Sequence, residues 1–248
     1  MVPFSRSKRK FRLKGLQART DRLAVSWEKL TGKLAERQPE ALAFATHIPV
    51  LAGLARIKKI ENILELGCGR FSTLTFINPD AFPHLKNLRT VENDPQWAKQ
   101  IRAHVAADSR VELVEYEGQI CNAIREMNLG EFDLILIDDS MRQEERAATI
   151  TQVSEKPGGT IVVMHDFEYA IYRRAANKFE NVYRFTALNP NTGVAWAGNR
   201  LERRPLRQLD KAIRQSGIAP NDISGWLRLL NNSPSNPEGS TKGAELDV

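Results

Sequence analysis

The stretch that decides the fold is ENILELGCGRFSTLTF, residues 61–76. A short apolar run carries Glu65 near its end, and Gly67 and Gly69 follow with Cys68 between them. Ligands of open parallel sheets bind beyond the carboxyl ends of the strands, and glycine at such a point lets the backbone approach a ligand closely. A tight turn from strand to helix, which needs glycine only for its backbone angles, explains the same residues without a ligand.

This turn lacks the third glycine of the dinucleotide-binding fingerprint. That glycine places a pyrophosphate at the N-terminus of the next helix. Arg70 and Phe71 stand at the positions where it could fall. A bulky pair suits a pyrophosphate poorly, and it is compatible with a ligand that has no phosphate at this point.

Short apolar runs alternate with helix-like segments along the middle of the chain. Runs of this kind indicate strands buried on both faces of a parallel sheet. Two more runs follow, joined by the short polar link NPNT, which suits an antiparallel hairpin at a sheet edge. The predicted strands are 62–67, 88–93, 110–116, 132–138, 159–166, 181–188 and 193–198, and the helices between the first five are near 72–78, 95–106, 119–128 and 141–154.

The two ends of the chain differ from this central region. We predict a basic, disordered arm over residues 1–19, N-terminal helices over 20–59, and the ligand-binding domain over 60–200. A C-terminal helical extension follows over 201–231, and a tail rich in Ser, Pro and Gly over 232–248 is predicted to be disordered. Pro49 should kink or divide the helix in which it lies.

Composition narrows the class of protein. The chain has 248 residues and a net charge of +6, with a pI of about 9.4. No window reaches the ~18 apolar residues of a membrane span, and no apolar segment of a signal peptide follows the basic start. Two cysteines make neither a disulfide framework nor a zinc site, so we expect a cytoplasmic protein. Three interpretations of the basic arm stay open. It is a solvated terminus, or it binds phosphates, acidic lipids or an acidic partner, or it is an organellar transit peptide.

The second predicted strand ends in VEND, with Glu92 at its tip. An acid at this place can accept both hydroxyls of a ribose, as in dinucleotide-binding folds. A surface acid before a helix is the alternative, and for Asp94 and Pro95 we expect the roles of N-cap and first-turn proline.

Four stretches in order resemble a known family. They are ILELGCGRFSTL (63–74), TVENDPQWA (90–98), FDLILIDDS (132–140) and PGGTIVVMHDF (157–167). Residues 60–198 are similar to the class I, Rossmann-like S-adenosylmethionine-dependent methyltransferases, in the bacterial branch with first motif Glu-x-Gly-x-Gly-x-x-Ser-Thr. The resemblance implies an α/β fold with a doubly wound, seven-stranded sheet, mostly parallel with an antiparallel last strand, and helices on both faces.

The resemblance also implies a cofactor site for S-adenosylmethionine. Around the methionine moiety it places Glu65, Gly67, Gly69, Ser72 and Thr73. Glu92 would bind the ribose hydroxyls, with Asn93 or Asp94 near the adenine. Glu117, in the YEG after the third strand, is a weaker candidate beside the adenine ring. Asp138 ends the fourth strand and would face the transferred methyl group.

An acceptor site is predicted at the carboxyl ends of the fourth and fifth strands. Asp138, Asp139, His165 and Asp166 gather there. His165 could serve as a general base. Asp138 and Asp166 could instead hold Mg²⁺, although His165-Asp166 stands where catechol-type methyltransferases carry Asp-Asn or Asp-Asp, which counts against the metal. Tyr169 and Tyr172, further along, line the acceptor pocket or belong to an ordinary amphipathic helix.

Other methyltransferase chemistries lack their motifs. The Asn-Pro-Pro-aromatic motif of amino-methylating nucleic-acid enzymes is replaced by IDDS, and no Pro-Cys follows the fourth strand to supply a thiolate. Cys68 is expected to be a packed bystander, and Cys121 a core or neutral residue.

The sequence therefore predicts a methyltransferase that acts on oxygen of a small-molecule or glycan-like acceptor. An RNA or other nucleic-acid methyltransferase is the first alternative, favoured by the basic arm. A cofactor-binding partner protein without catalysis is the second. The acceptor, the metal and the oligomeric state stay open.

Overall fold

The computed structural model describes residues 39–156 and 158–232. The predicted basic arm and nearly all of the predicted tail lie outside the described residues. Among the described helices, none is long and apolar enough to cross a membrane.

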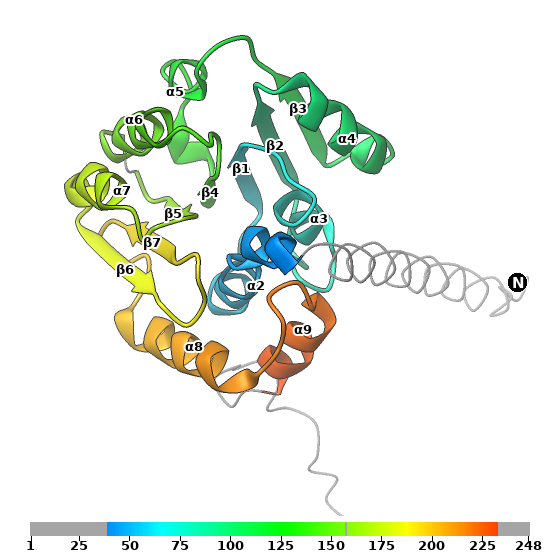
Figure 1. Ribbon diagram of the computed structural model, residues 1–248, viewed down its shortest axis with the longest axis vertical. Helices are drawn as coiled ribbons and strands as arrows, with labels where there is room; N and C mark the ends of the chain where they lie inside the picture. Colours follow the sequence, from blue (N-terminus) through cyan, green and yellow to red (C-terminus); the bar gives the residue numbers. More distant parts are fainter. Residues whose placement is uncertain (1–38, 157, 233–248) are drawn as a thin grey trace, which may run out of the picture. The chain divides into compact units, whose positions relative to one another are not determined.

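A seven-stranded mixed sheet forms the centre (Figure 1). Its order is β3-β2-β1-β4-β5-β7-β6, and β7 runs antiparallel to both of its neighbours while the other six strands are parallel to one another. The strands are β1 (Asn62–Leu66), β2 (Asn87–Glu92), β3 (Val111–Glu115), β4 (Leu134–Ile137), β5 (Ile161–Met164), β6 (Asn181–Phe185) and β7 (Thr192–Trp196). Each lies on one of the seven predicted runs, and the predicted fold class is confirmed.

The register aligns the carboxyl ends of the central strands. Leu66 pairs with Val91 of β2 on one side and with Ile137 of β4 on the other. Ile137 in turn pairs with Met164 of β5. The residues that follow these four positions therefore emerge along one edge of the sheet.

Helices precede, connect and follow the strands. They are η1 (Pro39–Ala45), α2 (Ile48–Ile57), α3 (Ser72–Ile77), α4 (Pro95–Val105), α5 (Ile120–Ala123), η2 (Leu129–Glu131), α6 (Gln143–Ser154), α7 (Ala170–Ala175), η3 (Ala176–Lys178), α8 (Arg203–Ser216) and α9 (Ile223–Asn231). The helix predicted over 119–128 is wrong in its length, because only the four residues of α5 are helical. The break between η1 and α2 falls just before Pro49, which lies in the first turn of α2.

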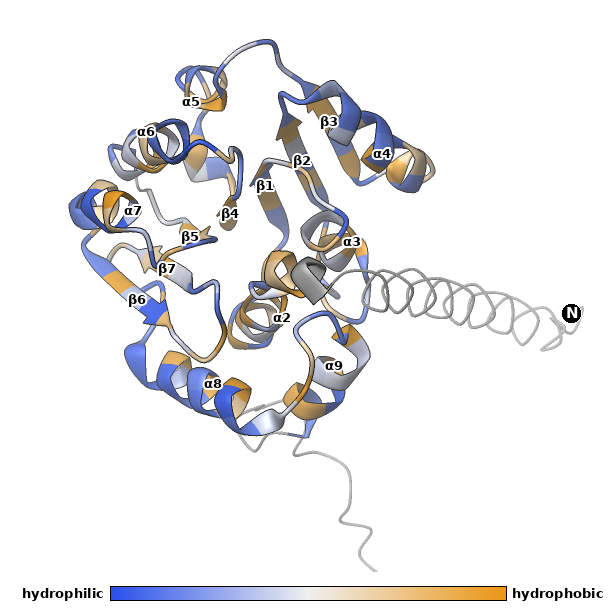
Figure 2. Ribbon diagram, viewed as in Figure 1, coloured by the Kyte–Doolittle hydropathy of each residue, from blue (hydrophilic) through white to orange (hydrophobic). Residues whose placement is uncertain are grey.

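Apolar side chains cover both faces of the sheet. On one face α5, α6 and α7 pack against the strands through residues such as Ile120, Ile150 and Tyr172. On the other, Ile101 and Val105 of α4 pack near Cys68. Both α8 and α9 contact α2, and Figure 2 shows α8 as a mostly hydrophilic helix with apolar residues spaced along it. These layers leave the carboxyl edge of the sheet to polar residues.

Candidate active site

The glycine turn begins where β1 ends. Gly67 has a φ of 87°, a conformation that side-chain-bearing residues rarely adopt. A Cβ atom on Gly67 would lie 2.3 Å from the backbone oxygen of Asp138. The turn therefore packs directly on the residue that follows β4, and only glycine fits there.

Glu65 lies beneath this turn and is fully buried. The Thr73 hydroxyl donates to its Oε2 at 2.7 Å, and the Gly69 N–H donates to Thr73 Oγ1 at 3.1 Å. Its other oxygen, Oε1, is buried without a hydrogen-bond partner. Burial raises the pKa of Glu65 to about 7, although the nearby hydroxyls of Ser72, Thr73 and Thr90 oppose the shift.

Glu92, at the end of β2, is tied to the backbone around it. Its Oε2 accepts the Cys68 N–H at 2.8 Å, and its Oε1 accepts the N–H groups of Asn93 and Asp94, each at 2.8 Å. A carboxylate offers about four lone-pair sites. One site remains for a ribose hydroxyl, and binding of the second hydroxyl requires one backbone N–H to be released.

The other residues predicted at the cofactor site have varied surroundings. Asp94 caps α4 by accepting from the backbone N–H groups of the next turn, as expected. Asn93 donates through Nδ2 to the Gly118 carbonyl at 2.8 Å. Ser72 is buried beside Thr73, whereas Glu117 is exposed. The role of each toward a cofactor stays a prediction.

Cys68 is buried in the glycine turn. Burial raises the pKa of its thiol well above the usual range, and the nearby carboxylates of Glu92 and Glu65 add to this. A thiol held in its protonated form is a poor nucleophile. The surroundings of Cys68 therefore agree with the prediction of a packed bystander, and Cys121 is buried as well.

At the ends of β4 and β5, one arginine joins two acids. Arg146 of α6 donates through Nη1 to Asp166 Oδ2 at 2.7 Å, and its Nη2 forms an ion pair with Asp138 Oδ1 at 2.8 Å. Arg146 is almost fully buried, whereas the side chains of Asp138 and Asp166 are 21% and 24% exposed. The guanidinium thus holds the two acids that were predicted as a possible Mg²⁺ pair, and it leaves one oxygen of each facing elsewhere.

Those two oxygens face His165. Its Nδ1 lies 3.3 Å from Asp138 Oδ2 and 3.6 Å from Asp166 Oδ1. Its Nε2 lies 3.0 Å from the hydroxyl of Thr46, which itself contacts the Ala43 carbonyl at 3.3 Å. Burial alone would lower the pKa of His165, but the carboxylates outweigh it and raise the pKa above its ordinary value. In the same way, His165 and Arg146 overcome the effect of burial and lower the pKa of Asp138.

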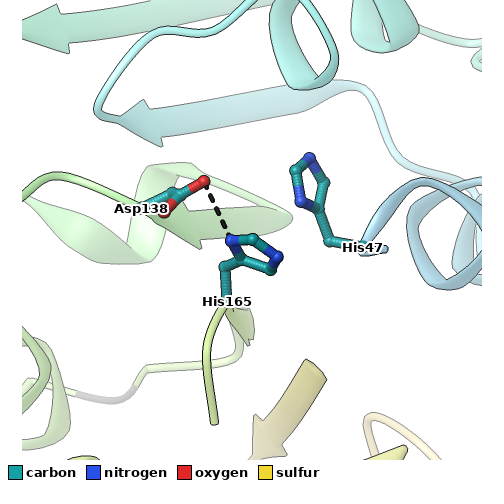
Figure 3. Close-up of side chains that lie close together, drawn as sticks. All are labelled: His47, Asp138 and His165. Atoms are coloured by element: carbon teal, nitrogen blue, oxygen red, sulfur yellow. Dashed lines mark ion pairs between the residues drawn. The ribbon is translucent and has the colours of Figure 1, made fainter. Parts of the chain in front are cut away.

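A second histidine, His47, lies beside Asp138 and His165 (Figure 3). Together with Asp166 these residues form one polar cluster. His47 immediately precedes α2, and its ring lies 4.7 Å from that of His165, edge to face. His47 is 1% exposed, and neither of its ring nitrogens has a hydrogen-bond partner. Burial, together with the charge of His165, lowers the pKa of His47 to about 3, so the ring is neutral.

Asp139 does not join this cluster. It is buried and accepts the Thr149 hydroxyl at 2.5 Å. Burial raises its pKa to about 6. The predicted set of four acceptor-site residues therefore divides into three that face one another, Asp138, His165 and Asp166, and Asp139, which pairs with Thr149 instead.

Sequence reasoning missed His47, Thr46 and Arg146. Arg146 carried a signal, because it shares the buried face of α6 with Ala147, Ile150 and Val153, and an arginine on an apolar face is rarely buried unless paired. His47 stands in the apolar stretch AFATHIPVLAGL, residues 43–54. Its sequence position gives no hint that it faces β4 and β5.

The arrangement has two chemical parts. Around Glu65 and Gly67 lie a buried, unpartnered carboxylate oxygen and a surface without side chains, which fit the cationic, phosphate-free methionine moiety of S-adenosylmethionine. Around Asp138 lie acids and histidines that can accept a proton or hold a cation. Gly67 joins the two parts by its contact with the Asp138 backbone.

No protein-family model and no curated protein sequence matches this chain. Solved structures with a similar fold include SAH-bound methyltransferase PaMTH1 of Podospora anserina, at 17% identity over 80% of this chain and 99% of that one, with a TM-score of 0.49. Precorrin-6y C5,15-methyltransferase of Geobacter metallireducens has 13% identity over 60% and 87%, with a TM-score of 0.45. Aeropyrum pernix fibrillarin with bound S-adenosyl-L-methionine has 13% identity over 60% and 74%, with a TM-score of 0.43. Identities this low describe a likeness of fold and not of reaction.

Proposed function

We propose that this protein is an S-adenosylmethionine-dependent methyltransferase that acts on oxygen of a small-molecule or glycan-like acceptor. The contact between Gly67 and the Asp138 backbone carries this proposal. It puts a turn suited to the cofactor directly beside a cluster suited to an acceptor. Methyl transfer needs this adjacency, since donor, methyl group and nucleophile must lie in line.

The residues assigned to the cofactor follow from their surroundings. The free Oε1 of Glu65 suits the amino group of the methionine moiety, and Gly67 and Gly69 leave room for it. Glu92 retains a lone pair for the ribose. The cofactor supplies an activated methyl group on a sulfonium, so the protein has to orient the reactants and exclude water.

We assign acceptor activation to His165, Asp138 and Asp166. When Nε2–H is donated to Thr46, the lone pair of neutral His165 is on Nδ1, beside the partly exposed carboxylates. A hydroxyl that enters from that side can pass its proton to Nδ1. Arg146 is a positioning residue, because it orients both carboxylates without facing the acceptor itself.

Two measurements test this function. Calorimetry should detect binding of S-adenosylhomocysteine, and labelled S-adenosylmethionine should transfer its methyl group to a small-molecule fraction of a cell extract. His165→Ala should bind cofactor normally and lose turnover, whereas His104→Ala, at an exposed position, should keep both. Absence of cofactor binding would refute the proposal. Binding without transfer to any fraction would favour the non-catalytic alternative.

A nucleic-acid acceptor is the second candidate, favoured by one surface. The outer side of α8 carries five exposed cationic residues: Arg203, Arg204, Arg207, Lys211 and Arg214. A basic face of this kind attracts phosphates. Transfer of the label to RNA, together with a steep loss of RNA binding as salt is raised, would support this candidate over a small-molecule acceptor.

A further inference from the structure

We propose that His47, Asp138 and His165 bind one divalent transition-metal ion. One nitrogen of each histidine and one carboxylate oxygen all lie within 4.8 Å of one another. Figure 3 shows the three side chains converging from separate parts of the chain: Asp138 follows β4, His165 follows β5 and His47 precedes α2. Small side-chain movements bring such atoms to the roughly 2.0–2.2 Å bond lengths of these metals.

One tautomer of His165 leaves a place for a cation beside the two acids. The Thr46 hydroxyl lies 3.3 Å from the Ala43 carbonyl and 3.0 Å from His165 Nε2. In the tautomer in which this hydroxyl donates to the carbonyl, it accepts the Nε2–H of His165. In the neutral ring, Nδ1 then carries a lone pair that faces two carboxylate oxygens at 3.3 and 3.6 Å. A lone pair and two carboxylate oxygens repel one another unless a proton or a metal ion lies between them.

His47 adds an independent reason. A buried imidazole almost always has a hydrogen-bond partner, and His47, at 1% exposure, has none for either nitrogen. Its ring touches that of His165. A metal ion shared with His165 and Asp138 would satisfy one of these nitrogens.

The ligand set selects the class of metal. Two imidazoles and one carboxylate suit zinc and the neighbouring first-row transition metals, whereas Mg²⁺ prefers oxygen ligands. Arg146 occupies the other oxygen of Asp138, so Asp138 offers one oxygen to the ion and the protein supplies three ligands. The charges also agree: two carboxylates against one guanidinium leave a net charge of −1, before any proton on His165 is counted.

The consequence for catalysis rests on the proposed function, but binding of the ion does not. An ion here takes the Nδ1 lone pair that would otherwise accept the acceptor's proton. It could then coordinate the acceptor oxygen and lower its pKa as a Lewis acid.

The chain offers a matched control for this inference. It contains four histidines, two in the cluster and two, His84 and His104, at exposed positions. The full chain without an affinity tag would be stripped with a chelator and titrated with Zn²⁺ by calorimetry and with Co²⁺ by visible absorption. The His84→Ala/His104→Ala double variant should bind one ion per chain, as the unaltered protein should.

Variants of the cluster should lose this ion. His47→Asn and His165→Asn should weaken binding more than about 100-fold, and Thr46→Val, which removes the partner of His165 Nε2, by about 10–100-fold. Thermal unfolding without metal would identify any variant that is not folded. Unchanged binding in folded His47→Asn protein, or loss of binding in the His84/His104 double variant, would overturn the inference. S-adenosylhomocysteine affinity, measured without metal, separates failure here from failure of the proposed function.

Discussion

Replacing Glu65 with glutamine should make the free energy of unfolding less dependent on pH. Glu65 is fully buried, and its environment raises its pKa from 4.5 to about 7. Between these values the folded protein binds a proton that the unfolded chain releases. Stability therefore falls as pH rises from 4.5 to 7 and changes little through this group above that. Glutamine keeps the shape and an acceptor for Thr73 but cannot ionise.

The size of this effect follows from the shift in pKa. One pKa unit corresponds to about 1.4 kcal/mol, so a shift from 4.5 to about 7 costs the unaltered protein about 3 kcal/mol between pH 4.5 and pH 8. No reduction for solvent screening applies, because the carboxyl is fully buried. Glu65→Gln should avoid this loss, and its free energy of unfolding should gain about 3 kcal/mol on the unaltered protein over that pH range.

Urea denaturation at pH 4.5 and pH 8, without cofactor, measures the difference directly. Glu126→Gln, at an exposed position in the same fold, is the matched control and should follow the unaltered protein at both values. An identical pH dependence of unfolding for Glu65→Gln and the unaltered protein would refute the reasoning. It would mean that Glu65 is ionised in the folded state with its charge compensated.

Three further substitutions test other contacts, each by chemical denaturation. Gly67→Ala should lower stability by more than 1 kcal/mol and abolish S-adenosylhomocysteine binding, because Gly67 has a positive φ and contacts the backbone of Asp138. Gly159→Ala should be close to neutral, because a Cβ atom there meets no atom within 4 Å. Arg146→Met should cost about 3–5 kcal/mol, since it leaves two carboxylates unpaired; Arg142→Met, at an exposed ion pair, should cost less than about 1 kcal/mol. Asp94→Ala should cost about 1 kcal/mol by removing the cap of α4, and serine at this position should restore most of it. Equal effects in a variant and its control would contradict the corresponding contact.

The seven strands could be predicted because burial on both faces leaves a direct mark on the sequence. LILI in β4 and IVVM in β5 are fully buried, and no polar residue interrupts either run. The hairpin of β6 and β7 could also be predicted, from its short polar link. The helix over 119–128 was overpredicted because apolar spacing does not fix length: after Ala123 the chain turns toward η2 instead of continuing.

The candidate site was predictable only where its residues end a strand. Asp138 and Asp166 follow buried runs, and the parallel register brings their positions to one edge. His47 and Arg146 reach the same edge from α2 and α6, and their contacts depend on how those helices pack. The hydrogen bonds from backbone N–H groups to Glu92 could not be predicted from the sequence for a similar reason, because the donor Cys68 lies on a different turn.

The buried charges at this edge agree with the proposed function. Arg146 and His165 are almost fully buried with two carboxylates between them, and an apolar packing of the same volume is often as stable or more stable. Only part of Asp138 and Asp166 reaches solvent, and the backbone of Asp138 lies against the glycine turn at Gly67. A purely structural ion pair has no need of a neighbouring histidine whose nitrogens lack partners. Two unsatisfied groups lie here: the ring nitrogens of His47, on one side of Asp138, and Oε1 of Glu65, beneath the glycine turn. A cation bound at either place would complete the hydrogen bonding and the charge balance that the chain leaves incomplete.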